Sequence, residues 1–358
     1  MWRTAFPPNI FSSIYSERKR EYMNILAFES SCDETAAAVV RDGRTVLSSV
    51  IASSADMHAI YGGVVPEIAS RKHVEAISGL ADEALRKAEL SKKDIDAVAV
   101  TYAPGLIGAL LVGVSFAKSA AFGLGVPLIP VHHVRGHIAA NYIAHPDLEP
   151  PFLCLCVSGG TTALVDVRDY THFEVLGGTR DDAAGECFDK TARVLGLGYP
   201  GGGPMDRMAQ GGNDKAYVFP RAHVADHPLD MSFSGLKTAV LNTIHHAEQK
   251  GEPLDLHDLA ASFAAAVSDS LVPRVMEANR VTGYQKIAVA GGVAANSRIR
   301  ADLERACAQA GARLWLPPLA LCGDNAAMIG SQGYYEYLAG HTAGWDLNGK
   351  ASLDIAKG

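Results

Sequence analysis

Two histidines spaced four residues apart are the strongest metal-binding candidates in the sequence. His133 and His137 share one face if their segment is helical, so both imidazoles can reach one ion, whereas His132 points elsewhere. Asp324 precedes a predicted helix and would complete a His–His–Asp set with open coordination positions, which suits Zn²⁺ or Fe²⁺. Each residue also fits a plainer role, because histidines are common in cores and on surfaces and Asp is a frequent helix N-cap.

Three glycine-rich segments can bring bare backbone against a ligand. The turn at 158–162 follows a predicted strand, segment 290–296 opens a helix that Asn296 can cap, and segment 199–204 is too rich in Gly and Pro for regular structure. Backbone N–H groups in such turns can bind an oxyanion, and bare backbone can pack against a flat adenine or ribose. A hairpin turn, a capped helix and a plain loop explain the same segments when each is taken alone.

Carboxylates stand near these turns. Asp33 and Glu34 lie in the polar turn between the first two predicted strands. In segment 181–190 the first carboxylates complement the positive end of a predicted helix, but Asp189 falls one turn later, where that explanation is weaker. Asp189 and Asp206 can accept hydrogen bonds from ligand hydroxyls.

The scaffold that positions these residues is predicted to be built twice. A strand–turn–strand unit occurs at 24–40 and again at 152–167, and in each half strands then alternate with helices, which predicts parallel pairing through helical crossovers. We therefore predict an α/β, duplicated, two-lobed protein with a ligand cleft between the lobes. The helices are predicted at 66–88, 107–122, 183–195, 256–281, 296–310 and 324–339.

The predicted organisation has four parts. Residues 1–22 form an N-terminal extension, a candidate for disorder, and we expect Met23 to be the natural start because a clear strand follows it. Residues 23–150 form the first lobe with the histidine pair, 151–340 form the second lobe with the glycine loops, and 341–358 form a C-terminal tail.

Composition limits the functional classes. The 358 residues are 48% hydrophobic and 20% charged, which excludes a mostly disordered chain, and the formal net charge of −7 argues against a basic coat for nucleic acid. The clearest basic site, Arg71, Lys72 and His73, is explained better by a solvated helix face. The apolar stretch at 106–126 contains Lys118 and predicts a buried helix, so we expect a cytoplasmic protein with no membrane partner.

The cysteines predict a reducing environment. None of the six cysteines forms a Cys-x-x-Cys pair, and Cys154 and Cys156 flank one residue of an apolar strand, so both would point to one face. We expect buried thiols and no disulfide framework.

Together these segments resemble one family, the TsaD tRNA N6-threonylcarbamoyladenosine transferases, once labelled glycoproteases. The resemblance covers nearly the whole chain and implies the duplicated actin/Hsp70-like ATPase fold. Two positions depart from the family pattern, because Thr161 stands where many members have His or Asn, and Arg135 where many bacterial members have Glu. The matching motifs lie in order at 29–35, 62–73, 131–137, 157–161, 181–190, 199–204, 291–296 and 322–328.

The resemblance also implies roles for individual residues. It implies one divalent metal ion, Fe²⁺ or Zn²⁺, held by His133, His137 and Asp324. The implied substrate is threonylcarbamoyl-AMP, and the resemblance implies that an adenine nucleotide can occupy the same site. Contacts with it are implied for Val157, Ser158, Gly159, Gly160, Thr161, Asp189, Gly202, Asp206 and Asn296.

The implied reaction transfers the threonylcarbamoyl group from threonylcarbamoyl-AMP to N6 of adenosine 37 in tRNAs that read ANN codons. The exocyclic amine is a poor nucleophile, so catalysis must orient it and activate the electrophile. The base lies in the single-stranded anticodon loop, from which it can be splayed into the cleft. We expect Glu34 or Asp33 to assist proton removal. The implied partners are a TsaB-like paralogue, which we expect to dock on the helix at 66–88, and a TsaE-like ATPase.

Three other classes remain open from the sequence. A small-molecule kinase of the same fold would need a catalytic Asp and a phosphoacceptor pocket, but not the His–His–Asp set. A metalloprotease would need Glu after the first histidine, and Arg135 is no general base. A catalytically silent scaffold subunit would have no reason to keep the metal set and the glycine loops together.

Overall fold

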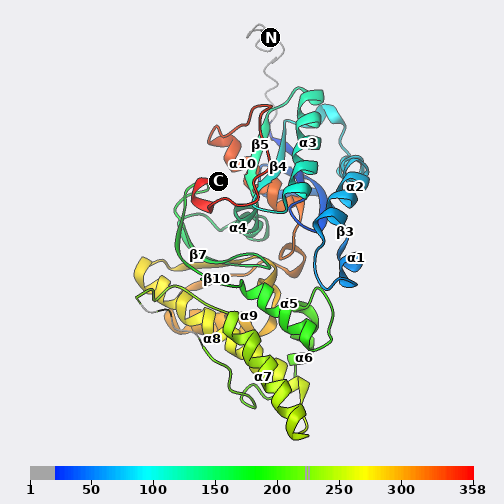
Figure 1. Ribbon diagram of the computed structural model, residues 1–358. Helices are drawn as coiled ribbons and strands as arrows, with labels where there is room; N and C mark the ends of the chain where they lie inside the picture. The colour runs from blue at the N-terminus through cyan, green and yellow to red at the C-terminus, as the bar shows by residue number, and fades with distance from the viewer. Residues whose placement is uncertain (1–20, 222–223, 225) are drawn as a thin grey trace, which may run out of the picture.

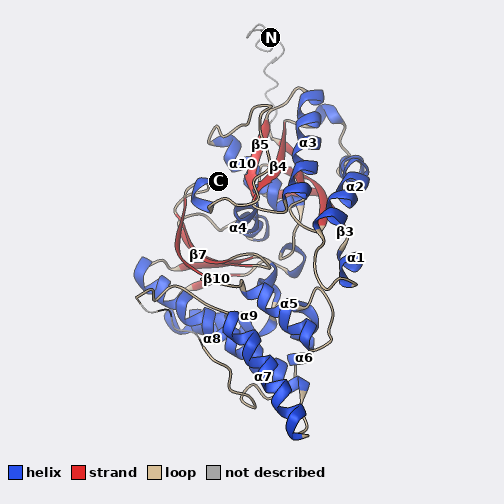
Figure 2. Ribbon diagram, viewed as in Figure 1, coloured by secondary structure: helices blue, strands red, loops and turns tan. Residues whose placement is uncertain are grey.

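Two five-stranded mixed sheets, one from each half of the chain, form the framework (Figures 1 and 2). The computed structural model describes residues 21–221, 224 and 226–358. The predicted N-terminal extension lies outside these described residues, apart from Glu21 and Tyr22.

The first sheet has the strand order β3-β2-β1-β4-β5. A meander of β1, β2 and β3 is antiparallel, and β1, β4 and β5 pair in parallel, as predicted. Helices α2 and α3 cover one face, where Leu26 and Phe28 of β1 meet them, and Ile25 and Ala27 face α10 on the other side. The bounds are β1 (Asn24–Glu29), β2 (Glu34–Arg41), β3 (Thr45–Ser53), β4 (Ala97–Ala103), β5 (Leu128–His132), α2 (Pro66–Lys87), α3 (Ile107–Leu124) and α10 (Ala326–Leu338).

The second sheet repeats this topology, which confirms the predicted duplication. Its order is β10-β9-β6-β7-β8. Read from the β8 edge, this is the order of the first sheet with five added to each strand number. Strand β6 pairs antiparallel with β7 and in parallel with β9, as β1 does with β2 and β4. The bounds are β6 (Phe152–Val157), β7 (Thr162–Val167), β8 (Phe173–Gly178), β9 (Lys286–Ala290) and β10 (Arg313–Trp315).

The remaining helices lie mainly on the second half. Helix α8 has more buried residues than any other of these helices, and its apolar face packs with β6 and β9 in the largest core cluster. Segment 199–204 was predicted to be irregular, and this prediction is wrong in part because helix α6 begins inside it at Gly202. Pro204 falls in its first turn, where a helix leaves the backbone N–H groups unpaired in any case. The bounds are α1 (Ala55–Ala59), α5 (Ala184–Val194), α6 (Gly202–Ala209), α7 (Ser234–Lys250), α8 (Leu256–Thr282) and α9 (Ser297–Ala310).

Two helices lie between the sheets and join the halves. Helix α4 (His133–Ala144) and α10 each contribute to the core against the first sheet and to the core against the second. A Cβ atom on Gly136 would lie 2.7 Å from Ile329 Cδ1, so a larger residue where α4 crosses α10 would make the Ile329 side chain shift. Our sequence-based division assigned α10 to 151–340, whereas it packs on strands of the first sheet. The division at residue 150 stays a prediction.

The cysteines match their expected surroundings, whereas the apolar helix predicted to be buried is largely exposed, because only 33% of the apolar window of α3 is buried. By length and composition, α3 and α8 are long and apolar enough to cross a membrane. Helix α3 packs on β4 and α2, however, and 72% of the apolar window of α8 is buried. All six cysteines are free, and Cys154 and Cys156 are buried on one face of β6 with their Sγ atoms 3.9 Å apart, as predicted.

Candidate active site

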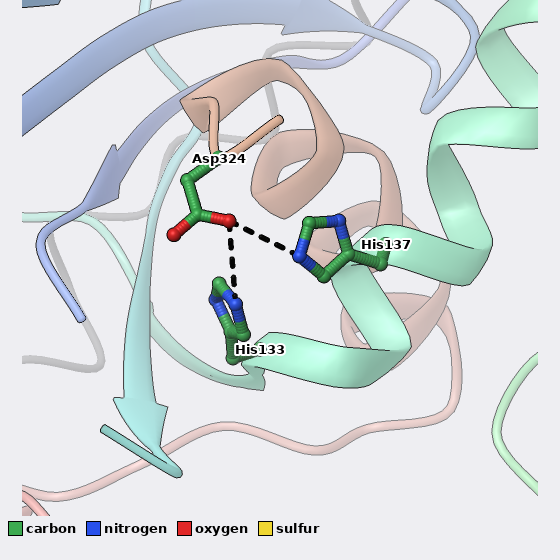
Figure 3. Close-up of side chains that lie close together, drawn as sticks. All are labelled: His133, His137 and Asp324. Atoms are coloured by element: carbon green, nitrogen blue, oxygen red, sulfur yellow. Dashed lines mark ion pairs between the residues drawn. The ribbon is translucent and has the colours of Figure 1, made fainter. Parts of the chain in front are cut away.

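The two predicted ligand histidines and Asp324 lie together (Figure 3). His133 is the first residue of α4 and His137 follows one turn later, so the helical period places both rings on one side. Asp324 reaches them from the loop before α10, and its Oδ1 lies 3.5 Å from His133 Nε2 and 3.1 Å from His137 Nε2. Segments almost two hundred residues apart in sequence therefore meet at one point.

The cluster fits a divalent cation. One donor atom from each of the three residues lies within 4.8 Å of the others. His137 is 3% exposed, yet its Nδ1 has no hydrogen-bond partner within the described structure, and its Nε2 faces Asp324 Oδ1 alone. A buried polar atom without a hydrogen-bond partner is costly unless a ligand binds it. Two nitrogen donors and one carboxylate oxygen form a ligand set that zinc and iron(II) accept.

The local charges reinforce one another. Burial favours the neutral form of Asp324, but the two histidines outweigh this effect and lower its pKa to about 2. Burial likewise opposes a charge on His133, but the carboxylates of Glu29 and Asp324 raise its pKa to about 9. Without an ion, His133 is therefore protonated at neutral pH and pairs with these carboxylates, and a divalent ion would bind by replacing that proton.

Asp324 is not the cap of the helix that it precedes. The N-cap of α10 is Asn325, whose side chain accepts a hydrogen bond from Met328 N–H at 2.9 Å. The capping role that would have explained Asp324 is therefore filled by its neighbour, and its carboxylate remains available to the histidines.

A cavity of about 360 Å³ adjoins this cluster in the second half. Its wall is rich in glycine, so backbone rather than side chains forms much of the surface. Gly323 belongs to the wall, so the cavity reaches the residue that precedes Asp324. The lining residues are Gly159, Gly185, Phe188, Asp189, Pro200, Gly202, Gly203, Asp206, Gly292, Val293, Ala295, Asn296 and Gly323.

Five of the residues predicted to contact substrate line this cavity, namely Gly159, Asp189, Gly202, Asp206 and Asn296. Three of them also have structural tasks. Asp189 Oδ1 accepts a hydrogen bond from Gly201 N–H at 2.7 Å, Asp206 accepts two from Ser297, and Asn296 caps α9. Burial raises the pKa of Asp189.

The other four predicted contacts are not among the residues that line this cavity. The Val157 side chain belongs to the core of the second half. Ser158 closes the turn, because its N–H donates to Thr161 O at 2.7 Å and its Oγ accepts from Thr161 N–H at 3.1 Å. Gly160 lies at the tip of this turn. The turn as a whole abuts the cavity through Gly159.

Asp33 and Glu34 are adjacent carboxyl groups at the start of β2. Burial raises the pKa of Glu34 to about 9, and the carboxyl groups of Asp33 and Asp324 add to this effect. Ser53 Oγ donates to Glu34 Oε1 at 3.1 Å. At neutral pH Glu34 therefore holds a proton, and its position is within the electrostatic reach of the cation site.

Two predicted clusters have structural explanations instead. Asp181 accepts hydrogen bonds from the backbone and side chain of Ser234 and from Phe233 N–H, so it stabilises the start of α7 rather than of α5. His73 is fully buried and does not belong to an exposed basic site with Arg71 and Lys72.

Sequence reasoning missed one residue of the site. Glu29 is the last residue of β1, and its Oε2 lies 3.0 Å from His133 Nδ1. The available signal was a carboxylate at the end of an otherwise apolar strand. Its partner lies 104 residues away, so spacing along the chain could not identify it.

The family model and two curated relatives carry the same description. Residues 45–331 match the TsaD family model, which is described as tRNA N6-adenosine threonylcarbamoyltransferase. A protein of that name from Clostridium botulinum (strain 657 / Type Ba4) is 55% identical over 338 residues, which cover 94% of this chain and 99% of that one. A protein of the same name from Clostridium perfringens (strain ATCC 13124) is 54% identical over 333 residues, covering 93% and 98%.

Solved structures share the fold at low sequence identity. HypF from T. kodakarensis has a TM-score of 0.62 at 17% identity, over 91% of this chain and 49% of that chain. Component A of the (R)-2-hydroxyglutaryl-CoA dehydratase of Acidaminococcus fermentans has a TM-score of 0.53 at 17% identity, over 88% and 98%. These likenesses concern the fold alone, and they agree with the predicted duplicated actin/Hsp70-like α/β architecture. The family match and the identity and coverage of the sequence relatives show that this chain belongs to the TsaD family of tRNA N6-adenosine threonylcarbamoyltransferases.

Proposed function

We propose that this protein transfers the threonylcarbamoyl group from threonylcarbamoyl-AMP to N6 of adenosine 37 in tRNAs that read ANN codons. The observation that carries the proposal is the adjacency of the two sites. The glycine-lined cavity includes Gly323, and the next residue, Asp324, lies 3.1 Å from His137. A nucleotide in the cavity would therefore have its reactive end beside the cation site.

His133, His137 and Asp324 would hold one divalent ion, Zn²⁺ or Fe²⁺. When bound, such an ion supplies a Lewis acid that polarises the threonylcarbamoyl group. The cavity residues have a separate task. Bare backbone at Gly202 and Gly292 leaves room for a flat adenosine, and Asp206 and Asn296 offer polar groups to its hydroxyls. The same cavity would accept an adenine nucleotide.

The transfer requires one bond to form and one to break. The N6 nitrogen forms a bond with the carbamoyl carbon, the bond between that carbon and the phosphate oxygen breaks, and AMP leaves with the electron pair. The N6 proton must then be accepted. We assign this task to the Asp33–Glu34 pair, with Asp33 as the acceptor, because Glu34 already holds a proton at neutral pH.

The tRNA and protein partners follow from the same proposal. The anticodon loop of tRNA would present the base to the site. A formal net charge of −7 gives this chain little attraction for tRNA by itself, so we propose that a TsaB-like paralogue and a TsaE-like ATPase work with it in the cytoplasm. The exposed faces of α2 and α3 are the proposed docking site for the paralogue.

The test is transfer of radiolabelled threonine from threonylcarbamoyl-AMP to unmodified tRNA, with the partner proteins present. We compare wild type with the double variant His133→Ala plus His137→Ala. His145→Ala is the matched control, because this histidine follows α4 and donates to Leu316 O at 2.8 Å, outside the cluster.

Incorporation by wild type and by His145→Ala that disappears in the double variant would support both the transfer and the cation site. Absence of incorporation by wild type with competent partners would overturn the proposal. The small-molecule kinase and the silent scaffold would then be the classes to test.

A further inference from the structure

A buried carboxylate outside the predicted ligand set contacts His133 from the core of the first sheet. Glu29 is 0% exposed, and it is the one charged residue of β1. The other five residues of this strand have apolar or amide side chains. An ionised side chain at such a position is costly unless all its oxygens are satisfied. Glu29 meets this condition, and its partners indicate what the charge does there.

Every partner of Glu29 donates a hydrogen bond. Ser31 N–H donates to Oε1 at 2.5 Å, and Thr101 Oγ1 donates to Oε2 at 2.5 Å. The same Oε2 lies 3.0 Å from His133 Nδ1. An ionised carboxylate can only accept, so Nδ1 must carry the hydrogen of this contact. In a neutral imidazole the free lone pair is then on Nε2, which is the atom that faces Asp324 Oδ1 at 3.5 Å.

We propose that Glu29 is a positioning residue that fixes the tautomer and the ring orientation of His133, so that Nε2 faces the cation. The inference rests on the metal site of the proposed function. Carboxylates that accept from the non-ligating nitrogen of a histidine commonly orient metal ligands in this way. Thr101 extends the arrangement into β4, because its hydroxyl holds the same oxygen that contacts the ring.

The charge of Glu29 has a second consequence. A histidine binds a metal ion through an unprotonated nitrogen, so an ion at this site would replace the extra proton of His133. The charges of Glu29 and Asp324 would then balance the charge of one divalent ion in a largely buried site. A glutamine at position 29 would remove one of these charges. It would also turn an amide NH₂ toward one of the three donors that now surround the carboxylate.

The two histidines differ in this respect. His137 has no hydrogen-bond partner on Nδ1 in the described structure, so its ring is oriented by packing and by the contact of its Nε2 with Asp324. His133 is held by the chain Thr101–Glu29–His133, all of it within or beside the first sheet. Hydrogen bonds through Glu29 therefore orient the ring of His133, whereas Nδ1 of His137 has no such support.

The experiment measures Zn²⁺ affinity of the full chain by competition with a chromophoric chelator, without tRNA or threonylcarbamoyl-AMP. We expect Glu29→Gln to weaken Zn²⁺ binding about 10- to 100-fold. Thr101→Val should weaken Zn²⁺ binding by a smaller factor. Thr101→Ser, which keeps the hydroxyl, should bind Zn²⁺ as tightly as wild type. Asp302→Asn removes a buried carboxylate that contacts Ser268 and Arg298 in the second half, so it controls for general destabilisation.

A second measurement isolates positioning from stability. In the Zn²⁺-loaded protein, the His133 Nδ1–H proton resonance should be shifted downfield in wild type and in Asp302→Asn. In Glu29→Gln it should move upfield or exchange with water, and in Thr101→Val it should move part of the way. Unchanged Zn²⁺ affinity and an unchanged resonance in Glu29→Gln would overturn the inference. If that variant does not fold, the same two results in Thr101→Val would overturn it. Zn²⁺ binding by wild type without transfer would instead count against the proposed function alone.

Discussion

Arg135 and Glu336 form an ion pair with the two charged groups 3.0 Å apart and both side chains only 3% exposed. Arg135 lies between His133 and His137 in sequence, but its guanidinium turns away from them. Its Nε and second amino nitrogen donate to Ile355 O at 2.9 and 2.7 Å. The pair thus links α4 to α10 and to the C-terminal segment, and this role accounts for an arginine at a position where the resemblance led us to expect glutamate.

Arg135→Glu should destabilise the protein severely. Two buried carboxylates would then face each other, and Ile355 O would lose its donors, so we expect a loss of about 3–5 kcal/mol in the free energy of unfolding. Urea unfolding measures it. The exchanged pair, Arg135→Glu with Glu336→Arg, should recover part of the loss. A single variant as stable as wild type would show that the pair does not hold α4.

His73 should matter for turnover but not for the metal. Its Nε2 donates to Cys32 O at 3.0 Å, and its Nδ1 accepts from Thr35 Oγ1 at 2.7 Å, so it supports both ends of the turn that carries Asp33 and Glu34. We expect His73→Ala to cost about 1–3 kcal/mol of stability and to lower kcat roughly tenfold or more. Zn²⁺ affinity should be unchanged. A fall in Zn²⁺ affinity as large as the fall in kcat would contradict this division of roles.

Filling the cavity should block the nucleotide without unfolding the chain. A Cβ atom on Gly202 would meet nothing within 4 Å, and the residue lines the cavity. We therefore expect Gly202→Val to leave stability within about 0.5 kcal/mol of wild type and to weaken AMP binding roughly tenfold or more, which corresponds to about 1.4 kcal/mol. Isothermal titration with AMP measures the effect.

Gly235→Ala is the control for this substitution, because a Cβ atom there is equally free of contacts and the residue does not line the cavity. Unchanged AMP binding in Gly202→Val, with the control also unchanged, would place the nucleotide elsewhere.

The proposed docking face on α2 and α3 can be tested by charge. Val74 of α2 is 64% exposed and Leu111 of α3 is 41% exposed, so both offer apolar surface to a partner. Val74→Glu with Leu111→Glu should abolish co-purification with a TsaB-like paralogue, because burying two carboxylates at an interface is costly. The control is Val281→Glu, a 62% exposed valine of α8 in the other half. Co-purification of the double variant at the wild-type level would exclude this face.

Local patterns predicted the parts of the site that lie within one element. The spacing of His133 and His137 sufficed to place both on one helical face, and the repeated strand–turn–strand unit sufficed to predict the two sheets. Helix α7 was missed because its buried stripe is narrow, with Leu236, Val240 and Ala247 alone fully buried among its residues.

Contacts between distant segments could not be predicted in this way. Glu29 meets Thr101 and His133, which lie 72 and 104 residues further along the chain, and only the folded sheet brings them together. Arg135 shows the same limit, because its partners Glu336 and Ile355 follow about two hundred residues later. Asp324 was proposed as the third ligand from its place before a predicted helix, but a helix cap explained the same context, and the family resemblance favoured the ligand role.

The free energy of unfolding should fall as the pH is lowered, because Asp302 then loses its charge. Burial opposes its charge, but hydrogen bonds from Ser268 and Arg298, with the charges of Arg298 and Arg305, lower its pKa below the ordinary value. A carboxyl group with a lowered folded-state pKa stabilises the fold fully above its unfolded value near about 3.9 and loses this contribution as the pH falls through the folded value. We therefore expect Asp302→Asn to cost about 1–3 kcal/mol near neutral pH. The difference from wild type should shrink below about pH 4, because protonated Asp302 then resembles asparagine. Urea unfolding of both proteins across this range measures it, and a difference that stays constant into acid would show that the carboxylate charge contributes nothing.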